Sequence, residues 1–427
     1  MTWLGVIADD VTGACDLAGV VTAAGLPATV LLGPPQPGDE PAPGAECAVV
    51  ALASRTAPAD DAVAWSVAAG QWLLDHGAQR LYQKYCSTFD STKDGTIGPV
   101  ADALADLTGT GSSVGTPATP AVGRTVYQGH LFVDGRLLSE SPLRDHPLTP
   151  MTDPDLARVL GAQTPRPVAV VPWPTFGGRA DAPASVRRQV AAAAGGHVLL
   201  DAITDADLDL HATTLFEGDE LLGGASGLAA GLARRYATLA GRAPGSGPSP
   251  LPDVDSGGGR VVLAGSCSRR TREQIAAFGG PVVRIGVDDL AADPARTVSA
   301  AIAAALTALR SADGSPVLVT TSLDPQELRR VQERHGRDRS ARLAEDALAD
   351  VARAVVEAGV RRLIVAGGET SGAVTRALGV RQVVIGDQVA PGVPWTVSAG
   401  PMRLALLLKS GNFGPADLFT TAWEVAP

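Results

Sequence analysis

Over most of the chain, short apolar runs alternate with longer segments in which apolar residues recur at helical spacing. This alternation is typical of strand–helix units, whose strands pair in parallel and are covered by helices. The pattern therefore predicts an α/β fold built on a mostly parallel sheet flanked by helices. In the first half, the predicted strands are residues 3–8, 28–32, 47–52, 80–85, 167–171 and 197–201, and the predicted helices are 12–24, 60–75 and 225–239.

Residues 124–138 depart from this alternation. The run RTVYQGHLFVDGRLL has two extended arms joined at Asp134-Gly135. This dipeptide suits the type I′ turn, which matches the twist of two antiparallel strands. We therefore expect a β-hairpin insertion in the N-terminal domain.

Residues 241–259, GRAPGSGPSPLPDVDSGGG, form the clearest boundary in the chain. A Pro/Gly/Ser stretch without apolar periodicity is typical of an exposed linker. A second strand–helix series follows, so we predict two α/β domains, residues 1–241 and 260–427, joined by a linker at 242–259. The predicted strands of this second series are residues 260–264, 282–286, 317–321, 363–366, 383–385 and 404–408.

Charge and composition narrow the possible partners. The 427 residues include 45 acidic and 35 basic ones, a formal net charge of −10, which argues against nucleic acid or an anionic membrane surface as the main partner. No apolar stretch is long enough to span a bilayer and the N-terminus resembles no signal peptide, so we expect a cytoplasmic protein. The cysteines form no CxxC pair and the histidines show no ligand spacing, so we expect no disulfide framework and no transition metal.

Lysine is unusually rare. Only Lys84, Lys93 and Lys409 occur among the 35 basic residues, and the rest are arginine. A lysine kept against such a bias indicates a site that needs a compact ammonium group, which guanidinium does not mimic. Chance retention on a solvated loop is the alternative.

The first candidate site is the turn IADDVTGACD, in which Asp9 and Asp10 end a strand and Thr12-Gly13 open a helix. Ligands of open α/β sheets bind at the carboxyl ends of strands. Paired carboxylates there could orient a hydroxyl group, act as a general base or hold Mg²⁺. The structural alternative is a helix N-cap, for which one of the two acids would suffice.

The second candidate is the segment QKYCSTFDSTKDGTIGPV, residues 83–100. Its donors and acceptors suit a polyhydroxylated anion such as a sugar acid, and the alternative is a polar loop with a helix cap. The residues that suggest binding are Lys84, Ser87, Thr88, Asp90, Ser91, Thr92 and Lys93.

Three glycine-containing turns follow predicted strands in the C-terminal half: LAGSCS at 263–268, GGETSG at 367–372 and KSGNFG at 409–414. Glycine lets the backbone approach a phosphate, and a helix N-terminus supplies unpaired N–H groups. We also expect the ammonium of Lys409 to face the phosphates. None of these turns is a GxGxxG or Walker A motif. Together they make this half the better candidate for a nucleotide site.

Taken in order, the motifs resemble those of the four-carbon acid sugar kinase family, and the match is closest to the branch that acts on 3-oxo-tetronate. They span nearly the whole chain, and their combination is more specific than any one of them. The motifs are IADDVTGACDLA, STFDSTKDGTIGPV, GRTVYQGHLFVDGRLLSES, HPLTPMTD, GSCSRRT, GGETSGAV, PGVPW and LKSGNFG.

The resemblance implies a sugar-acid-binding N-terminal domain, a nucleotide-binding C-terminal domain and ATP-dependent phosphorylation of the terminal hydroxyl of 3-oxo-tetronate. Threonate and erythronate are alternative acceptors. The motif positions that the resemblance assigns to ATP binding are Ser266, Gly367, Gly368, Glu369, Thr370 and Gly411. The motif positions that the resemblance assigns to the acid-sugar side of the site are Asp9, Asp10, Lys84, Asp90, Ser91, Arg124 and His130.

Phosphoryl transfer needs positioning and positive charge more than covalent chemistry. We therefore expect Mg²⁺ to bind the nucleotide phosphates. We expect Asp10, in preference to Asp90, to accept the hydroxyl proton. Arg124 and a lysine would bind the substrate carboxylate. The oligomeric state stays open, with a homo-oligomer possible.

A dinucleotide-dependent sugar-acid oxidoreductase would need a glycine-rich first turn where this chain has aspartates. A non-catalytic sugar-acid sensor would have no use for the phosphate-like turns.

Overall fold

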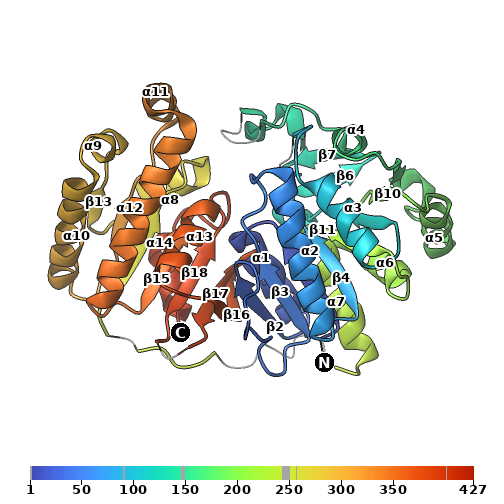
Figure 1. The fold of residues 1–427 in the computed structure, drawn as a ribbon, viewed down its shortest axis with the longest axis horizontal. Helices are drawn as coiled ribbons and strands as arrows, with labels where there is room; N and C mark the ends of the chain where they lie inside the picture. Colours follow the sequence, from blue (N-terminus) through green and yellow to red (C-terminus); the bar gives the residue numbers. More distant parts are fainter. Residues whose placement is uncertain (1, 90–91, 146–149, 243–250, 256, 401) are drawn as a thin grey trace. The chain divides into compact units, whose positions relative to one another are not determined.

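The computed structural model describes residues 2–89, 92–145, 150–242, 251–255, 257–400 and 402–427, and its chain forms two compact units, residues 1–248 and 249–427 (Figure 1). Each unit contains a sheet with helices on both faces, so the predicted α/β class is confirmed. The division falls within residues 242–259, the predicted linker, of which 243–250 and 256 lie outside the described residues.

The sheet of the first unit is parallel throughout, in the order β2-β3-β1-β4-β11-β5-β10-β9. Its central strands are buried on both faces, as expected for apolar runs covered by helices. The strands are β1 (Leu4–Ala8), β2 (Ala28–Leu32), β3 (Cys47–Ala51), β4 (Arg80–Lys84), β5 (Ser113–Thr116), β9 (Val168–Val171), β10 (His197–Leu200) and β11 (Leu221–Gly224).

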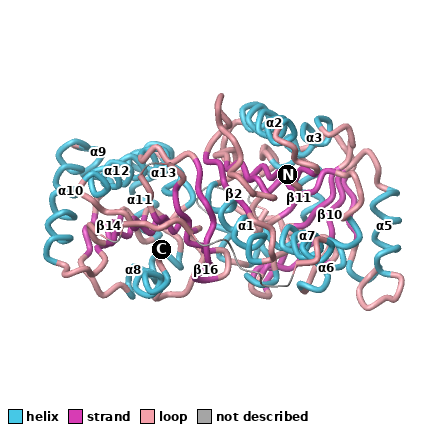
Figure 2. Tube along the Cα trace, turned by 90° about the horizontal axis from the view of Figure 1, so that it is seen from below, coloured by secondary structure: helices cyan, strands magenta, loops and turns pink. Residues whose placement is uncertain are grey.

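Helices α2 and α3 cover one face of this sheet, and α1, α6 and α7 pack together on the other (Figure 2). Leu73 of α2 and Leu104 of α3 are fully buried against strand residues such as Ile7 and Val50. The helices are α1 (Val11–Ala23), α2 (Ala59–Asp75), α3 (Ile97–Leu107), α4 (Leu156–Gly161), α5 (Ala182–Ala192), α6 (Asp205–Leu215) and α7 (Ser226–Leu239).

The predicted hairpin forms, but it has a third strand. β6 (Arg124–Tyr127), β7 (His130–Val133) and β8 (Arg136–Leu137) pair antiparallel. The turn at Asp134-Gly135 is present, and a second turn lies at 128–129 inside the first predicted arm. The side chain of Asp201, at the end of β10, accepts hydrogen bonds from both N–H groups of that second turn. A contact so distant in sequence explains why local pattern did not predict it.

The sheet of the second unit has the order β13-β14-β12-β15-β18-β17-β16. It is parallel from β13 to β18, whereas β17 pairs antiparallel with both of its neighbours. The strands are β12 (Arg260–Ala264), β13 (Val282–Arg284), β14 (Val317–Thr320), β15 (Arg362–Ala366), β16 (Gln382–Ala390), β17 (Val393–Ser398) and β18 (Ala405–Lys409).

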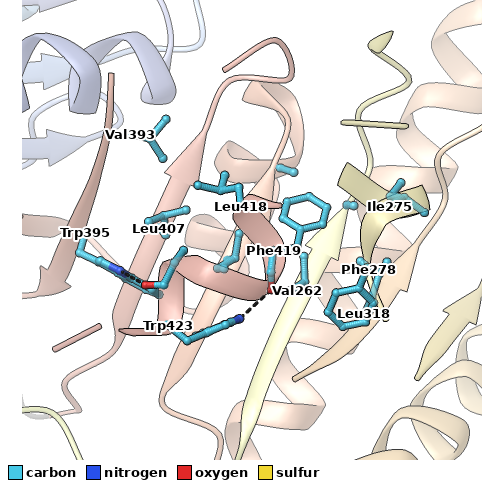
Figure 3. Close-up of a cluster of buried hydrophobic side chains, with 14 of the residues drawn as sticks. Val262, Ile275, Phe278, Leu318, Val393, Trp395, Leu407, Leu418, Phe419 and Trp423 are labelled. Atoms are coloured by element: carbon cyan, nitrogen blue, oxygen red, sulfur yellow. Dashed lines mark hydrogen bonds between the residues drawn. The ribbon is translucent and has the colours of Figure 1, made fainter. Parts of the chain in front are cut away.

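In this unit α8 and α14 lie on one face, and α10, α12 and α13 on the other (Figure 2). The apolar cluster under α8 and α14 holds Trp395 and Trp423, whose indole N–H groups donate to the carbonyls of Ala422 (3.0 Å) and Phe419 (2.8 Å) (Figure 3). The helices are α8 (Arg269–Ala277), α9 (Val287–Ala292), α10 (Pro294–Ser311), α11 (Pro325–His335), α12 (Arg337–Glu357), α13 (Gly368–Ala377) and α14 (Leu418–Thr421).

No helix in the described parts of the chain combines the length and the apolar character needed to span a bilayer.

Candidate functional site

In the first unit, charged residues gather where β1 and β4 end side by side. Ala8 pairs with Lys84, and the backbone N–H of Asp9 continues the ladder to the carbonyl of Lys84 at 3.1 Å. From these ends, β1 leads to α1 on one face of the sheet and β4 leads toward α3 on the other. Such a topological switch point is where open α/β sheets bind ligands.

Asp10 is the N-cap of α1. Its Oδ1 accepts from the N–H of Gly13 at 2.7 Å, and its Oδ2 accepts from the hydroxyl of Thr12 at 2.9 Å. The capping alternative therefore accounts for the position of one of the two acids. It leaves Asp9 to be explained by another contact.

That contact is Arg55, a residue that sequence reasoning missed. Its Nε and Nη2 donate to the two carboxylate oxygens of Asp9 at 2.9 and 2.8 Å, and its Nη2 lies 3.1 Å from Oδ1 of Asp10. The N–H groups of Ser54 and Arg55 also donate to the carbonyl of Asp9. Arg55 follows β3, which is the neighbour of β1, so strand order would have located it.

The charges around Asp10 determine its ionisation. Burial raises the pKa of Asp10, but the positive charges of Arg55 and Lys84 and the hydrogen bonds from Gly13 and Thr12 together hold that pKa below its ordinary value of 3.8. Asp10 is therefore a carboxylate at neutral pH.

Lys84, the last residue of β4, is 3% exposed. Within the described chain its ammonium has one hydrogen-bond acceptor, the carbonyl of Tyr85 at 3.0 Å, although an ammonium can donate three bonds. A Cβ on Gly13 would lie only 2.4 Å from Oδ1 of Asp10 and 2.9 Å from Nζ of Lys84. Glycine at position 13 thus allows helix, carboxylate and ammonium to meet.

A third carboxylate, Asp16, points from α1 toward the same charges and is 8% exposed. Burial raises its pKa, while the charge of Lys84 and a hydrogen bond with Ser226 oppose the increase. Ser226 begins α7 directly after β11. Three neighbouring strand ends therefore contribute to this group of charges.

The other predicted acid-sugar residues are placed differently. Arg124 donates to the carbonyl of Val122 and lies 4.0 Å from Asp134, and the Nδ1 of His130 is 2.8 Å from the carbonyl of Gln128. Both therefore bond to carbonyl groups of the residues that flank β6. Among the described residues, neither forms a hydrogen bond or ion pair with Asp9, Asp10 or Lys84. Asp90 and Ser91 lie outside the described residues.

In the second unit, three glycine-containing turns meet at the ends of β12, β15 and β18. The N–H groups of Gly265 and Ser266 donate to the carbonyl of Ala366 at 3.2 Å each, and the N–H of Gly367 donates to the carbonyl of Lys409 at 2.9 Å. β12 leads to α8 on one face and β15 to α13 on the other, so this edge is also a switch point.

Gly411 brings the third turn against the first. A Cβ at this position would lie 2.2 Å from the hydroxyl oxygen of Ser266 and 3.0 Å from that of Ser268. Atoms cannot approach so closely, so a larger residue would require at least the Ser266 hydroxyl to move. The structure thus brings Ser266, Gly367–Thr370 and Gly411 together, as the motifs implied.

Helix α13 begins at Gly368, inside the GGETSG turn. Gly367 is the N-cap with a φ of 129°, and no side chain caps the helix. The first intrahelical bond runs from the N–H of Ser371 to the carbonyl of Gly367. The N–H groups of Gly368, Glu369 and Thr370 therefore belong to the first turn, where a helix binds anions.

The expectation that the Lys409 ammonium faces a phosphate is wrong. Lys409 is fully buried, and its Nζ donates to Oε1 of Gln274 at 2.9 Å and to Oγ1 of Thr271 and the carbonyl of Gly411 at 3.2 Å each. Its charge lies beneath the turn rather than on it, because α8 supplies two of the three acceptors.

Family models match both units. A sugar-binding N-terminal domain matches residues 4–232, and a nucleotide-binding C-terminal domain matches residues 261–419. The switch point of β1 and β4 lies in the first match, and the three glycine-containing turns lie in the second.

Curated proteins resemble the chain over nearly its whole length. A 3-oxo-tetronate kinase of Pseudomonas fluorescens is 44% identical over 98% of this chain and 96% of its own, and one of Salmonella typhimurium is 38% identical over 99% of each. Among solved structures, a Salmonella typhimurium protein provisionally described as a tRNA synthase covers all of both chains, with a TM-score of 0.85 and 36% identity. A Haemophilus influenzae protein covers 99% of each chain, with a TM-score of 0.73 and 34% identity.

Proposed function

This chain belongs to the four-carbon acid sugar kinase family, and we propose that it transfers a phosphoryl group from ATP to the terminal C4 hydroxyl of 3-oxo-tetronate, giving 3-oxo-tetronate 4-phosphate. Curated relatives with that activity in their names are 38–44% identical over nearly the full length. The oxidoreductase and sensor alternatives do not agree with these relatives. The need for ATP favours the cytoplasm as the location.

The observation that carries the proposal is the meeting of three turns at one edge of the second sheet. The first-turn N–H groups of α13 and the turns at Ser266 and Gly411 offer a positive, closely approachable surface for polyphosphate. We assign ATP to this surface.

Mg²⁺ forms part of the proposal on the nucleotide side. Burial and the nearby charge of Glu369 raise the pKa of Glu345 to about 7, so the two carboxyl groups interact. In the described chain no group of three or more His, Cys, Asp and Glu could hold a metal alone. One or two carboxylates together with substrate phosphates commonly hold Mg²⁺. Glu345 and Glu369 would hold the ion, which would neutralise phosphate charge.

For the sugar acid, we propose that its carboxylate binds Lys84, whose ammonium can donate further hydrogen bonds beyond the one to Tyr85. We assign the proton of the reacting hydroxyl to Asp10, which Arg55 and Lys84 keep ionised. A loose phosphoryl-transfer transition state needs a well-placed acceptor more than a strong base. Asp9 then orients Arg55, and Arg124, His130, Asp90 and Ser91 stay predictions for the rest of the sugar acid.

An ADP-release assay over a panel of four-carbon acids tests the function. We expect the highest kcat/KM with 3-oxo-tetronate, lower values with threonate and erythronate, and almost no release without an acceptor. A higher value with threonate or erythronate would change the assigned substrate but keep the kinase. No acceptor-dependent ADP with any acid would overturn the kinase itself.

A further inference from the structure

Lys409 carries a buried charge without a counter-charge. The side chain is fully buried, and among the described residues no carboxylate lies within ion-pair distance of its ammonium. Its three donors meet neutral acceptors on Gln274, Thr271 and Gly411. Neutral acceptors satisfy the hydrogen bonds but leave the desolvated charge uncompensated.

The elements packed against Lys409 do not neutralise it either. From α8 the nearest charge is Arg270, which is itself positive and pairs with Glu273 at 3.0 Å. α14 presents the ring of Phe419, whose centroid is 5.8 Å from Nζ, and β15 presents Ala366. Burial, with a smaller contribution from Arg270, lowers the pKa of Lys409 to about 7.

Lys409 also contacts two of the three turns of the proposed nucleotide site and the helix that follows the third. Its carbonyl accepts from the N–H of Gly367, and its ammonium donates to the carbonyl of Gly411. Through Thr271 it reaches the first turn of α8, whose N-cap Ser268 donates to the same Gly411 carbonyl at 2.6 Å. The ammonium therefore helps tie the Gly411 turn to α8, together with the hydroxyls of Ser268 and Thr271, which donate to the same carbonyl.

We propose that Lys409 is a positioning residue of the nucleotide site and takes up one proton from solvent when the triphosphate binds. The inference rests on the proposed function, because it assumes polyphosphate at the three turns. An anion on the surface above a buried, poorly screened group stabilises its charged form. The charged form donates three hydrogen bonds and tightens the Gly411 turn, so the two events reinforce each other.

The expected pH dependence has a definite sign. Above about pH 7 the free protein holds a neutral Lys409, so nucleotide binding must recruit a proton and weakens as the pH rises. The limit for one proton is about a tenfold loss of affinity for each pH unit. At acid pH the ammonium is already charged, and binding takes up no proton at this residue.

Lysine NMR tests the free protein directly, because the chain has only three lysines. With ¹³Cε-labelled lysine, one signal should titrate near pH 7 and disappear in Lys409→Met. Saturation with a non-hydrolysable ATP analogue should move that titration up by about one pH unit or more. A Lys409 signal that titrates near its ordinary value, or that the analogue leaves unmoved, overturns the inference.

Calorimetry at about pH 8 in two buffers of different ionisation enthalpy tests the linkage. When the analogue binds, the wild type should take up about 0.4 proton if the pKa rises by one unit and about 0.8 proton if it rises by two, and Lys409→Met should take up much less. The variant should also raise the KM for ATP about tenfold and leave the KM for the sugar acid unchanged. Arg310→Met, at an exposed position on α10, is the matched control and should behave as wild type.

The outcomes separate this inference from the proposed function. Analogue binding without proton uptake by the wild type overturns the role of Lys409 and leaves the nucleotide site intact. Absence of analogue binding to the wild type overturns the nucleotide site, and this inference falls with it. If Lys409→Met does not fold, the wild-type buffer comparison decides alone.

Discussion

At the scale of single residues, Asp10 combines a structural contact with the charge that the proposed chemistry uses. Its two oxygens accept from Gly13 and Thr12 and cap α1, while Arg55 and Lys84 favour its ionised form. A carboxylate has about four acceptor positions, so capping leaves it able to accept a hydroxyl proton. The two roles can be separated because asparagine also caps helices well.

We therefore expect Asp10→Asn to keep the fold and lose turnover. Asparagine retains an oxygen for the N–H of Gly13 but has no negative charge and no useful basicity. The kcat should fall about 10²- to 10⁴-fold with little change in the KM for ATP. Steady-state ADP release and a circular dichroism spectrum measure both properties. A variant with wild-type kcat would remove Asp10 from its assigned role.

Arg55 should control the pH range in which Asp10 works. Without its charge, the pKa of Asp10 rises toward the ordinary 3.8, so the acid limb of the kcat profile should move to higher pH in Arg55→Met. Arg55→Lys keeps a positive charge but not the two-pronged contact with Asp9, and should restore part of the profile. Identical acid limbs in all three proteins would contradict this role.

The same substitution should change stability with a defined sign. A carboxylate with a depressed pKa in the folded state stabilises the protein above its unfolded pKa, and this stabilisation is lost as the pH falls through the folded value. Arg55→Met should thus lower the unfolding free energy at neutral pH by about 2 kcal/mol and flatten its loss on acidification. Urea unfolding at several pH values measures both. An unchanged slope would show that Asp10 does not depend on Arg55.

At the scale of elements, the nucleotide site depends on how closely β18 and α8 bring their turns. Gly411→Ala would place a methyl group 2.2 Å from the hydroxyl oxygen of Ser266 and should raise the KM for ATP about 10- to 100-fold. Gly279→Ala is the matched control, because a Cβ there meets no atom within 4 Å. Equal KM values for the two variants would contradict the assigned geometry.

The local hydrophobic pattern predicted most helices and strands because few polar residues interrupt their apolar runs. The strands near 4–8, 28–32 and 260–264 needed nothing beyond consecutive buried residues. The short strands β5 (SVGT) and β11 (LLGG) were missed because glycine weakens a strand signal, and β17 was missed because it contains Pro394.

The candidate sites were predictable in part, for a related reason. Strand–turn–helix motifs identified Asp9, Asp10 and the C-terminal turns, since motif and contact are both local. Arg55 reaches Asp9 across 46 positions, and two of the three acceptors of Lys409 lie 135 to 138 positions away on α8, so these contacts have no local signal. Only strand order could have supplied them.

At the scale of the whole molecule, each unit is assigned one ligand, and turnover requires both. Asp10→Asn should leave the affinity for an ATP analogue unchanged, whereas Gly411→Ala should leave the affinity for the sugar acid unchanged. Changes at positions that share no contact usually add, so the double variant should show the sum of the two single effects on binding. Titration calorimetry with each ligand measures this. Loss of analogue binding in Asp10→Asn would contradict the assignment of ligands to units.

The most direct measurement is a crystal structure with a non-hydrolysable ATP analogue and 3-oxo-tetronate. We predict that the phosphates accept hydrogen bonds from the backbone of Gly368 and Gly411 and from the hydroxyl of Ser266, and that the sugar-acid carboxylate contacts Lys84. A nucleotide bound away from these three turns, or a sugar acid bound away from the ends of β1 and β4, would contradict the account.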